Sequence, residues 1–255
     1  MLGYQHMVQQ PQPNNYIEPD VLLVHKPIGI SSFDVLRRLR TILGTKKLGH
    51  AGTLDPLAHG LMIVGVNTGT KKMTSYLKLP KVYLADIVIG RSTTTGDQEG
   101  EITRKVILGK SDLKKSEVES VVVNMIGHHT LSVPLYSAIK VEGKALYRYA
   151  REGKEPPYIP EKEMVVTEAQ LLDLYHNGRG AYVAKVRLGV DSGAYIRTLA
   201  EELGRRLGDL PASLSGLYRL SIGSYLDRDA FRLEPAPTRP GFIRAILDLL
   251  FAKRS

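Results

Sequence analysis

The chain alternates between stretches with strand-like and helix-like spacing of apolar residues. Val21 to Val24 and Leu61 to Val66 are short apolar runs that predict buried strands. Lys81 to Gly90 has the Val, Ile and Tyr content of a strand as well. Between the first two runs, apolar residues recur at helical spacing from Val35 to Leu43, and Gly44 is a typical helix end.

The second half of the chain continues this mixture. Tyr182 to Val190 alternates, with apolar residues on one face and Lys185 and Arg187 on the other, so it predicts a strand with one solvent-facing side. One predicted helix has Ser111 or Asp112 as its cap and a core-facing side made of Val118, Val121, Val122, Met125 and Ile126. A second predicted helix carries Ile196, Leu199, Ala200, Leu203 and Leu207 on one face. Together these elements predict an α+β fold with a central, mostly antiparallel sheet.

The two ends of the chain differ from the part between them. Residues 1–20 are rich in Gln, Asn and Pro, contain neither Lys nor Arg, and lack the apolar core of a secretory signal. Residues 235–255 begin with Pro235, Pro237 and Pro240 and continue into an apolar-rich segment, Phe242 to Phe251. We therefore expect a disordered leader over 1–20, one main domain over 21–234, and a linker with a short helix over 235–255.

The charge balance favours a polyanionic partner. The chain holds 35 Lys and Arg against 26 Asp and Glu, a net charge of +9 with a pI near 9.6. It contains no Cys, which excludes disulfides, thiolate nucleophiles and Cys-ligated zinc. Its seven His do not have the spacing of a zinc motif, so we expect no metal site. Since the sequence shows neither a transmembrane run nor a targeting segment, we expect a cytoplasmic protein.

One loop surrounds a single carboxylate, Asp55, with three glycines, two histidines and a proline, and it runs from Gly49 to Gly60. Two interpretations are open. Asp55 followed by Pro56 is a good helix start, with the carboxylate as N-cap. Such a helix would reach Gly60 after about one turn, which leaves the cap little to stabilise. Alternatively, the carboxylate lies at a loop tip and faces a ligand.

The Asp55 loop closely resembles the catalytic motif of the TruB family, the tRNA pseudouridine synthases that modify uridine 55 of the T arm. The residues that carry this likeness read GHAGTLDPLAHGL. Further stretches resemble the same family in order along the chain, from His25 to Leu220: HKPIGISS, RSTTTGDQEG, YSAIKVEGKALYRYAR, DSGAYIR and the weaker LYRL. Three positions depart from the family's pattern, namely Thr94, Ser192 and Ala194.

The resemblance implies a pseudouridine synthase fold with an RNA-contacting insertion, and an isomerase that converts uridine 55 of tRNA to pseudouridine. It implies that Asp55 is the catalytic residue and that Arg197 pairs with it. All routes to pseudouridine need an ionised carboxylate in a site that excludes water, and burial raises a carboxylate pKa unless a cation opposes it. The sequence does not choose between stabilisation of or addition to C1′ and removal of a C2′ proton. No step calls for a cofactor.

The resemblance also assigns supporting roles around the substrate. It implies that His50 lies where the base leaves its stack and that Tyr83 stacks on the uracil. It also implies that Leu217 lines the pocket, and Tyr195 matches a residue of the family's motif. Without a functional role, Tyr83 would be an ordinary aromatic residue of the core and Arg197 an ordinary residue of a helix surface. We expect phosphate contacts from basic residues beside these motifs, although such runs are often only solvated surface: Arg37, Arg38, Lys46, Lys47, Lys140, Lys144, Arg148 and Arg151.

Two other functions remain open at this point. The guide-RNA-dependent relatives use the same chemistry but usually have a different Asp loop and long extra domains. An RNA-binding protein without catalysis predicts that Asp55 or Arg197 is substituted, and both are present. Most bacterial relatives continue into a small RNA-binding PUA domain, for which about sixty more residues would be needed, so we expect none here. We expect a monomer that binds the tRNA T arm.

Overall fold

The structure, a computed structural model, describes residues 16–18 and 20–233. The chain forms two compact units, one from Met1–Leu77 with Ser224–Ser255 and the other from Lys78–Gly223. The division falls inside the segment 21–234, which the sequence led us to treat as one domain. The expected linker and helix over 235–255 lie outside the described residues.

The first unit is built on a small sheet with the order β1-β2-β4. Its strands are β1 (Tyr16–Glu18), β2 (Val21–Lys26), β3 (Leu48–His50), β4 (Ala58–Val66) and β15 (Phe231–Arg232). Strand β3 pairs with the end of β4, and β15 runs parallel to β2, whereas the other pairings of this sheet are antiparallel. Because β1 is a paired strand, regular structure begins within the segment that we expected to be a disordered leader; residues 1–15 are not described.

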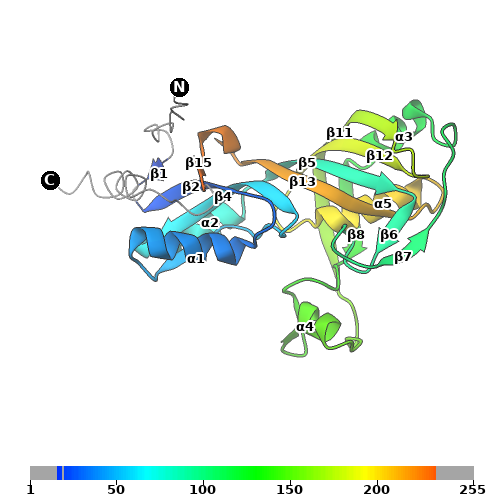
Figure 1. The fold of residues 1–255 in the computed structure, drawn as a ribbon. Coiled ribbons are helices and arrows are strands. Elements are labelled where there is room, and N and C mark those ends of the chain that lie inside the picture. Colours follow the sequence, from blue (N-terminus) through cyan, green and yellow to red (C-terminus); the bar gives the residue numbers. More distant parts are fainter. Residues whose placement is uncertain (1–15, 19, 234–255) are drawn as a thin grey trace, which may run out of the picture. The chain divides into compact units, whose positions relative to one another are not determined.

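Helix α1 (Ser32–Leu43) covers one face of this sheet (Figure 1). Ser31 caps it in a capping box with Asp34, and Gly44 ends it in the left-handed conformation at φ 62°. Ser31 is therefore the N-cap of α1, and Ser32 is its first residue. The remaining elements of this unit are short: η2 (Asn67–Lys72), α2 (Met73–Leu77), β14 (Tyr225–Leu226) and η3 (Asp227–Asp229).

The second unit contains an antiparallel sheet with the order β13-β5-β12-β11-β8. Its strands are β5 (Lys81–Ile89), β8 (Gly127–Ser132), β11 (Glu161–His176), β12 (Tyr182–Val190) and β13 (Ala212–Ile222). Strand β12 has the predicted bounds and alternation. Its apolar residues are buried, while Lys185 and Arg187 pair with Asp86 and Glu168 on the wetter face. The strand prediction is therefore confirmed.

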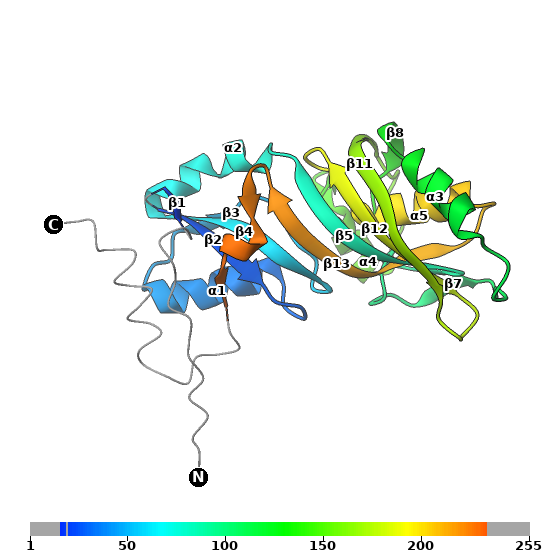
Figure 2. The same cartoon turned by 90° about the horizontal axis from the view of Figure 1, so that it is seen from above.

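Helices α3 (Lys115–Val123) and α5 (Ile196–Arg206) pack together on one side of this sheet (Figure 2). The apolar face of α5 is buried as predicted. For α3 the prediction was partly wrong, because the helix starts after Lys114 and Ile126 is 50% exposed beyond its end. The Asp112 carboxylate accepts a hydrogen bond from the Gly109 N–H at 2.7 Å, which closes a turn instead of capping a helix.

Five short elements complete the second unit: β6 (Arg91–Thr93), β7 (Ile102–Lys105), β9 (Lys140–Val141), β10 (Lys144–Ala145) and α4 (Leu146–Arg151). The β9-β10 hairpin and α4 form an arm that leaves the sheet between β8 and β11 (Figure 1). Across the described ranges, no helix has the length and apolar content needed to cross a membrane.

Candidate functional site

In the first unit, the Asp55 loop connects β3 to β4. Pro56 and Leu57 form a turn, and the Ala58 N–H donates to the Asp55 carbonyl at 3.0 Å where β4 begins. A strand therefore follows the carboxylate, and the interpretation of Asp55 as a helix cap is wrong. The Asp55 residue is half-buried.

Both neighbours of Asp55 are held by hydrogen bonds from the segment that precedes and begins α1. The Leu54 N–H donates to the Ser32 Oγ at 2.8 Å, and the Ser32 hydroxyl donates to the Leu54 carbonyl at 3.0 Å. On the other side, the Pro56 carbonyl accepts from the Gly29 N–H at 2.8 Å. Because both flanking residues are tied to the segment Gly29–Ser32, the backbone that carries Asp55 is fixed in position.

The Lys26 side chain supports the same loop from within the core. It is fully buried, and its Nζ donates to the carbonyls of Ile30 at 2.6 Å, Pro27 at 3.0 Å and Pro56 at 3.4 Å. Burial of an ammonium group is costly unless its donors are satisfied, and carbonyl dipoles satisfy them here. The stretch HKPIGISS therefore holds the Asp55 loop by specific hydrogen bonds.

The other candidate residues of the first unit lie around the loop. His50 is the last residue of β3 and is half-buried opposite Val64. Arg37 and Arg38 lie on α1, and the Arg37 guanidinium pairs with Asp34 at 2.8 Å. Lys46 and Lys47 are exposed in the turn before β3.

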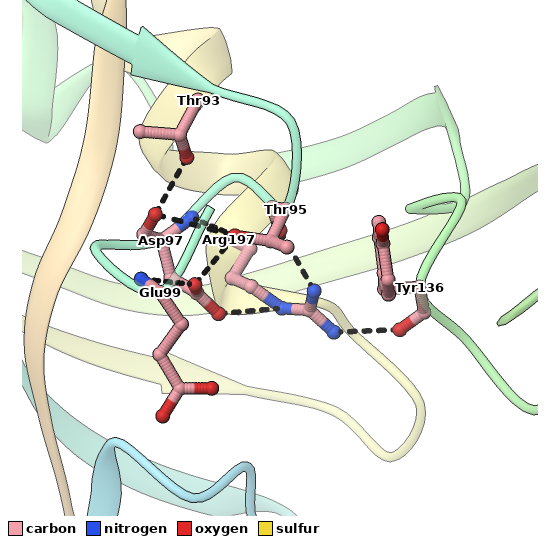
Figure 3. Close-up of polar contacts among 6 residues, drawn as sticks. All are labelled: Thr93, Thr95, Asp97, Glu99, Tyr136 and Arg197. Carbon is pink, nitrogen blue, oxygen red and sulfur yellow. Dashed lines mark hydrogen bonds and ion pairs between the residues drawn. The ribbon is translucent and has the colours of Figure 1, made fainter. Parts of the chain in front are cut away.

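In the second unit, Arg197 is the second residue of α5 and is buried, with 6% of its surface exposed. Its Nη1 donates to the Thr95 carbonyl at 2.8 Å, and its Nη2 donates to the Tyr136 carbonyl at 3.0 Å. Its Nε lies 4.0 Å from the Asp97 carboxylate (Figure 3). The alternative of a helix-surface arginine is excluded by this burial, and the guanidinium plane is fixed by groups from two segments, the β6–β7 turn and the stretch that contains Tyr136.

Asp97 organises the turn between β6 and β7 that meets Arg197 (Figure 3). Its carboxylate accepts from the Thr95 hydroxyl at 2.6 Å and from the Glu99 N–H at 3.0 Å, and the residue is 3% exposed. Gly96 approaches α5 so closely that a Cβ would lie 3.3 Å from the Arg197 Cβ. In the sequence analysis, Asp97 lies in the stretch RSTTTGDQEG that resembles the family, but no role was assigned to it. The sequence did contain a signal for this residue. An acidic residue within a turn rich in Thr and Gly is a candidate partner for a buried arginine.

Tyr83 and Leu217 lie in neighbouring strands of the same sheet. Tyr83 in β5 is opposite Leu188 of β12 and Arg219 of β13, and Leu217 is opposite Ala85. Both Tyr83 and Leu217 are buried, with 8% and 7% of their surface exposed.

Tyr195 immediately precedes α5 and is half-buried. Its N–H donates to the Met164 sulfur at 3.4 Å, and the Lys162 Nζ lies 6.0 Å from the centre of its ring. The ring also packs against the small apolar cluster that supports the arm.

The arm carries the second set of basic candidates. Lys140, Arg148 and Arg151 are exposed, as expected. Lys144 differs, because its Nζ lies 2.6 Å from a Glu152 carboxylate oxygen and 4.3 Å from the centre of the Tyr149 ring. Lys144 is therefore already engaged by its own arm.

The structure thus brings some predicted site residues together within each unit. Asp55 and His50 belong to the first unit, whereas Tyr83, Tyr195, Arg197 and Leu217 belong to the second. The pairing of Arg197 with Asp55, which the resemblance implies, stays a prediction.

Comparison with known sequences identifies relatives of most of the chain. The family model described as TruB family pseudouridylate synthase (N terminal domain) matches residues 40–196. The tRNA pseudouridine synthase B of Fusobacterium nucleatum is 40% identical over 205 residues, which cover 80% of this chain and 68% of that protein. The protein of the same name from Bacillus subtilis is 37% identical over 215 residues, 84% of this chain and 68% of that protein.

Solved structures share the fold. A chain of the Cbf5-Nop10-Gar1 complex superposes with a TM-score of 0.61 at 25% identity, over 84% of this chain and 52% of that chain. A chain of an H/ACA RNP bound to a substrate RNA containing 2'-deoxyuridine gives 0.58 at 22% identity, over 83% and 50%. Our chain spans about half the length of these two. The expected pseudouridine synthase fold, a mostly antiparallel sheet with flanking helices, is confirmed.

Proposed function

Because the chain belongs to the TruB family of pseudouridylate synthases, we propose that it isomerises uridine 55 in the T arm of tRNA to pseudouridine. One observation carries this proposal. Asp55 stands in a loop whose flanking residues are both hydrogen-bonded to the segment Gly29–Ser32, and a strand follows it, so the carboxylate has no helix to cap. A fixed, partly accessible carboxylate is what catalysis at a sugar carbon requires.

The reaction rearranges bonds without a net gain or loss of atoms. The N1–C1′ bond breaks, the uracil turns while it is held, and a C5–C1′ bond forms. The proton on C5 then leaves, and N1 gains one. Positive charge develops on the sugar as the glycosidic bond breaks, and we propose that Asp55 meets it by stabilising or adding to C1′ or by taking a C2′ proton. The residues of this chain leave these routes open.

We propose that Arg197 serves the same reaction as the cation that keeps the carboxylate ionised. Arginine stays charged at all relevant pH values, and its planar group can hold a carboxylate with two hydrogen bonds. Its contacts with Thr95, Asp97 and Tyr136 support this role, since they fix the guanidinium before substrate arrives. Fixed charges need no reorganisation during the reaction.

Four further residues complete the proposed site. Tyr83 would stack on the uracil and could relay the C5 proton, His50 would occupy space where the base leaves its stack, and Leu217 would wall the pocket. Tyr195 would support the corner that carries Arg197. A uridine inside a folded arm must be flipped out of its stack, which makes such aromatic and apolar groups necessary.

RNA affinity would come from basic residues in both units. The proposed phosphate contacts lie in the first unit and in the arm: Arg37, Arg38, Lys46, Lys47, Lys140, Lys144, Arg148 and Arg151. The net charge of +9 supports a polyanionic substrate. For a substrate of this kind we propose a cytoplasmic enzyme that acts as a monomer.

The alternatives are less well supported. The likeness to the guide-RNA-dependent complexes supports the fold alone, whereas the relatives at 37% to 40% identity carry the name tRNA pseudouridine synthase B. A binding protein without catalysis is disfavoured because both Asp55 and Arg197 are retained.

The test is a site-resolved assay. The protein is incubated with an unmodified tRNA transcript, and pseudouridine is mapped at nucleotide resolution. The proposal expects modification at position 55 and none in a transcript with cytidine at that position. Modification only at other positions, or only in the presence of a guide RNA, would overturn it.

A further inference from the structure

Helix α1 carries an aromatic residue on its solvent side. Phe33 is 54% exposed, although the helix already buries a full apolar face toward the sheet. An exposed Phe gains little from the hydrophobic effect, so packing does not explain its presence here. Its neighbours on the same face provide a different explanation.

Two guanidinium groups lie over the Phe33 ring. The Cζ atoms of Arg37 and Arg40 are 5.5 Å and 5.2 Å from the ring centre. Both distances fall within the cation–π range of about 6 Å, and the spacing of four and seven residues places the three side chains on one helix face. The ring therefore holds two otherwise flexible cations in place, which lowers the entropy cost of binding an anion.

The two arginines differ in their other partners. Arg37 is anchored by Asp34, whose own pKa is lowered by hydrogen bonds from Ser31. Arg40 makes no ion pair and no side-chain hydrogen bond with any residue that the structure describes, and its Nε is buried without an acceptor. A buried donor without an acceptor is costly, and a charged one more so. Arg40 is thus a positioned cation whose guanidinium has no oxygen partner among the residues that the structure describes.

We propose that Phe33, Arg37 and Arg40 form a phosphate-binding platform for the sugar–phosphate backbone of tRNA. In this platform the Arg40 guanidinium donates to a phosphate oxygen, and the Phe33 ring holds both guanidinium groups in position. The identity of the RNA rests on the proposed function. RNA is the occupant that the charge supports, because guanidinium forks match phosphate geometry and the face carries no carboxylate other than the Asp34 that Arg37 already holds.

The experiment is a binding titration with unmodified tRNA at several salt concentrations. For Arg40→Ala, the slope of log affinity against log salt is expected to become shallower by a little under one unit, the value for one lost phosphate contact. Between about 50 and about 200 mM salt, that contact accounts for roughly a threefold fall in affinity. Arg40→Lys is expected to keep the slope but bind more weakly, because the charge remains and the planar fork is lost. Phe33→Leu is also expected to keep the slope but bind tRNA more weakly, because it removes the aromatic ring but neither cation.

Arg104→Ala is the matched control. Arg104 is an exposed arginine that is paired with Asp209 at 2.9 Å, and its removal is expected to leave affinity and slope unchanged. Thermal unfolding of each variant checks that the helix is intact. The proposal is overturned if Arg40→Ala binds tRNA with wild-type affinity and slope. A failure of uridine 55 modification by the wild type would refute the proposed function, while this titration would still decide whether the platform holds RNA.

Discussion

Ser32 and Leu54 exchange two hydrogen bonds, although 22 residues separate them in the chain. The Leu54 N–H donates to the Ser32 Oγ at 2.8 Å, and the hydroxyl returns a bond to the Leu54 carbonyl at 3.0 Å. Ser32 is 1% exposed, so water does not compete for these bonds. One buried hydroxyl thereby fixes the backbone immediately before Asp55.

Replacement of Ser32 by Ala is expected to lower the maximal turnover rate while leaving tRNA affinity nearly unchanged. The variant leaves both backbone groups of Leu54 unsatisfied, and the Asp55 carboxylate loses its fixed position. A displacement of about 1 Å can cost roughly a hundredfold in rate, and we expect a loss of at least about tenfold. Pseudouridine formation at saturating and limiting tRNA separates kcat from KM.

The neighbouring Ser31→Ala is the control for Ser32→Ala. Ser31 caps α1, and its loss is expected to cost about 1 kcal/mol of stability without a comparable loss of turnover. If both variants lose stability and neither loses rate, the Ser32 bonds serve folding and do not position the loop.

Asp97→Asn is expected to reduce turnover by about ten- to a hundredfold with little effect on tRNA affinity. The amide keeps the size of the carboxylate but removes the charge that faces the Arg197 Nε at 4.0 Å. Thr95→Ala is the matched variant, since it removes the 2.6 Å hydrogen bond to Asp97 and leaves the charge in place. Equal losses in the two variants would show that the turn matters and the charge does not.

Glu152→Gln is expected to strengthen tRNA binding and to steepen its dependence on salt. The Glu152 carboxylate lies 2.6 Å from the Lys144 Nζ and 3.3 Å from the Lys154 Nζ, and these hydrogen bonds lower its pKa. It therefore competes with RNA phosphates for two cations of the arm. Glu155→Gln removes the same charge at a position that pairs with neither lysine. A larger effect of Glu155→Gln would contradict the assignment.

Lys81 makes the unfolding free energy depend on pH above neutrality. It is 5% exposed, and burial, followed by the neighbouring Arg219, lowers its pKa to about 8 from the ordinary lysine value of 10.5. Between these two pH values the unfolded state holds more of this proton than the folded state, so the Lys81 contribution raises stability as pH increases. The rise amounts to about 3 kcal/mol at about 1.4 kcal/mol per pH unit.

Lys81→Met removes this titrating group. The free energy of unfolding of the wild type is therefore expected to rise relative to that of the variant between pH 8 and pH 10.5. Denaturant unfolding at a series of pH values measures both proteins, and groups common to both cancel in the difference. A difference that stays constant across this window would refute the role of Lys81.

Elements with strong periodicity could be predicted from the sequence. Strand β12 has the predicted bounds because its alternation continues for nine residues, and the apolar face that was predicted for α5 is buried. The start of α3 was missed because local hydrogen bonds decide it. Asp112 looked like a cap, but its carboxylate is taken by the Gly109 N–H.

The candidate site was less accessible to sequence analysis. The motif around Asp55 identified the loop but not the residues that hold it. From sequence alone, a serine at the start of a helix can either cap that helix or clamp a distant loop by hydrogen bonds. The structure separates the two roles, with Ser31 as cap and Ser32 as clamp. The pairing of Asp97 with Arg197 joins residues 100 positions apart, and such a contact has no periodic signal.

Asp55→Asn tests the central claim most directly. The substitution keeps the volume and hydrogen-bonding shape of the side chain and removes its charge. The measurement is single-turnover formation of pseudouridine at position 55, with wild type and variant in excess over an unmodified tRNA that both bind. We predict no detectable product with the variant and tRNA affinity within about twofold of the wild type. Product formation within about tenfold of the wild-type rate, equivalent to about 1.4 kcal/mol, would show that Asp55 is not the catalytic residue.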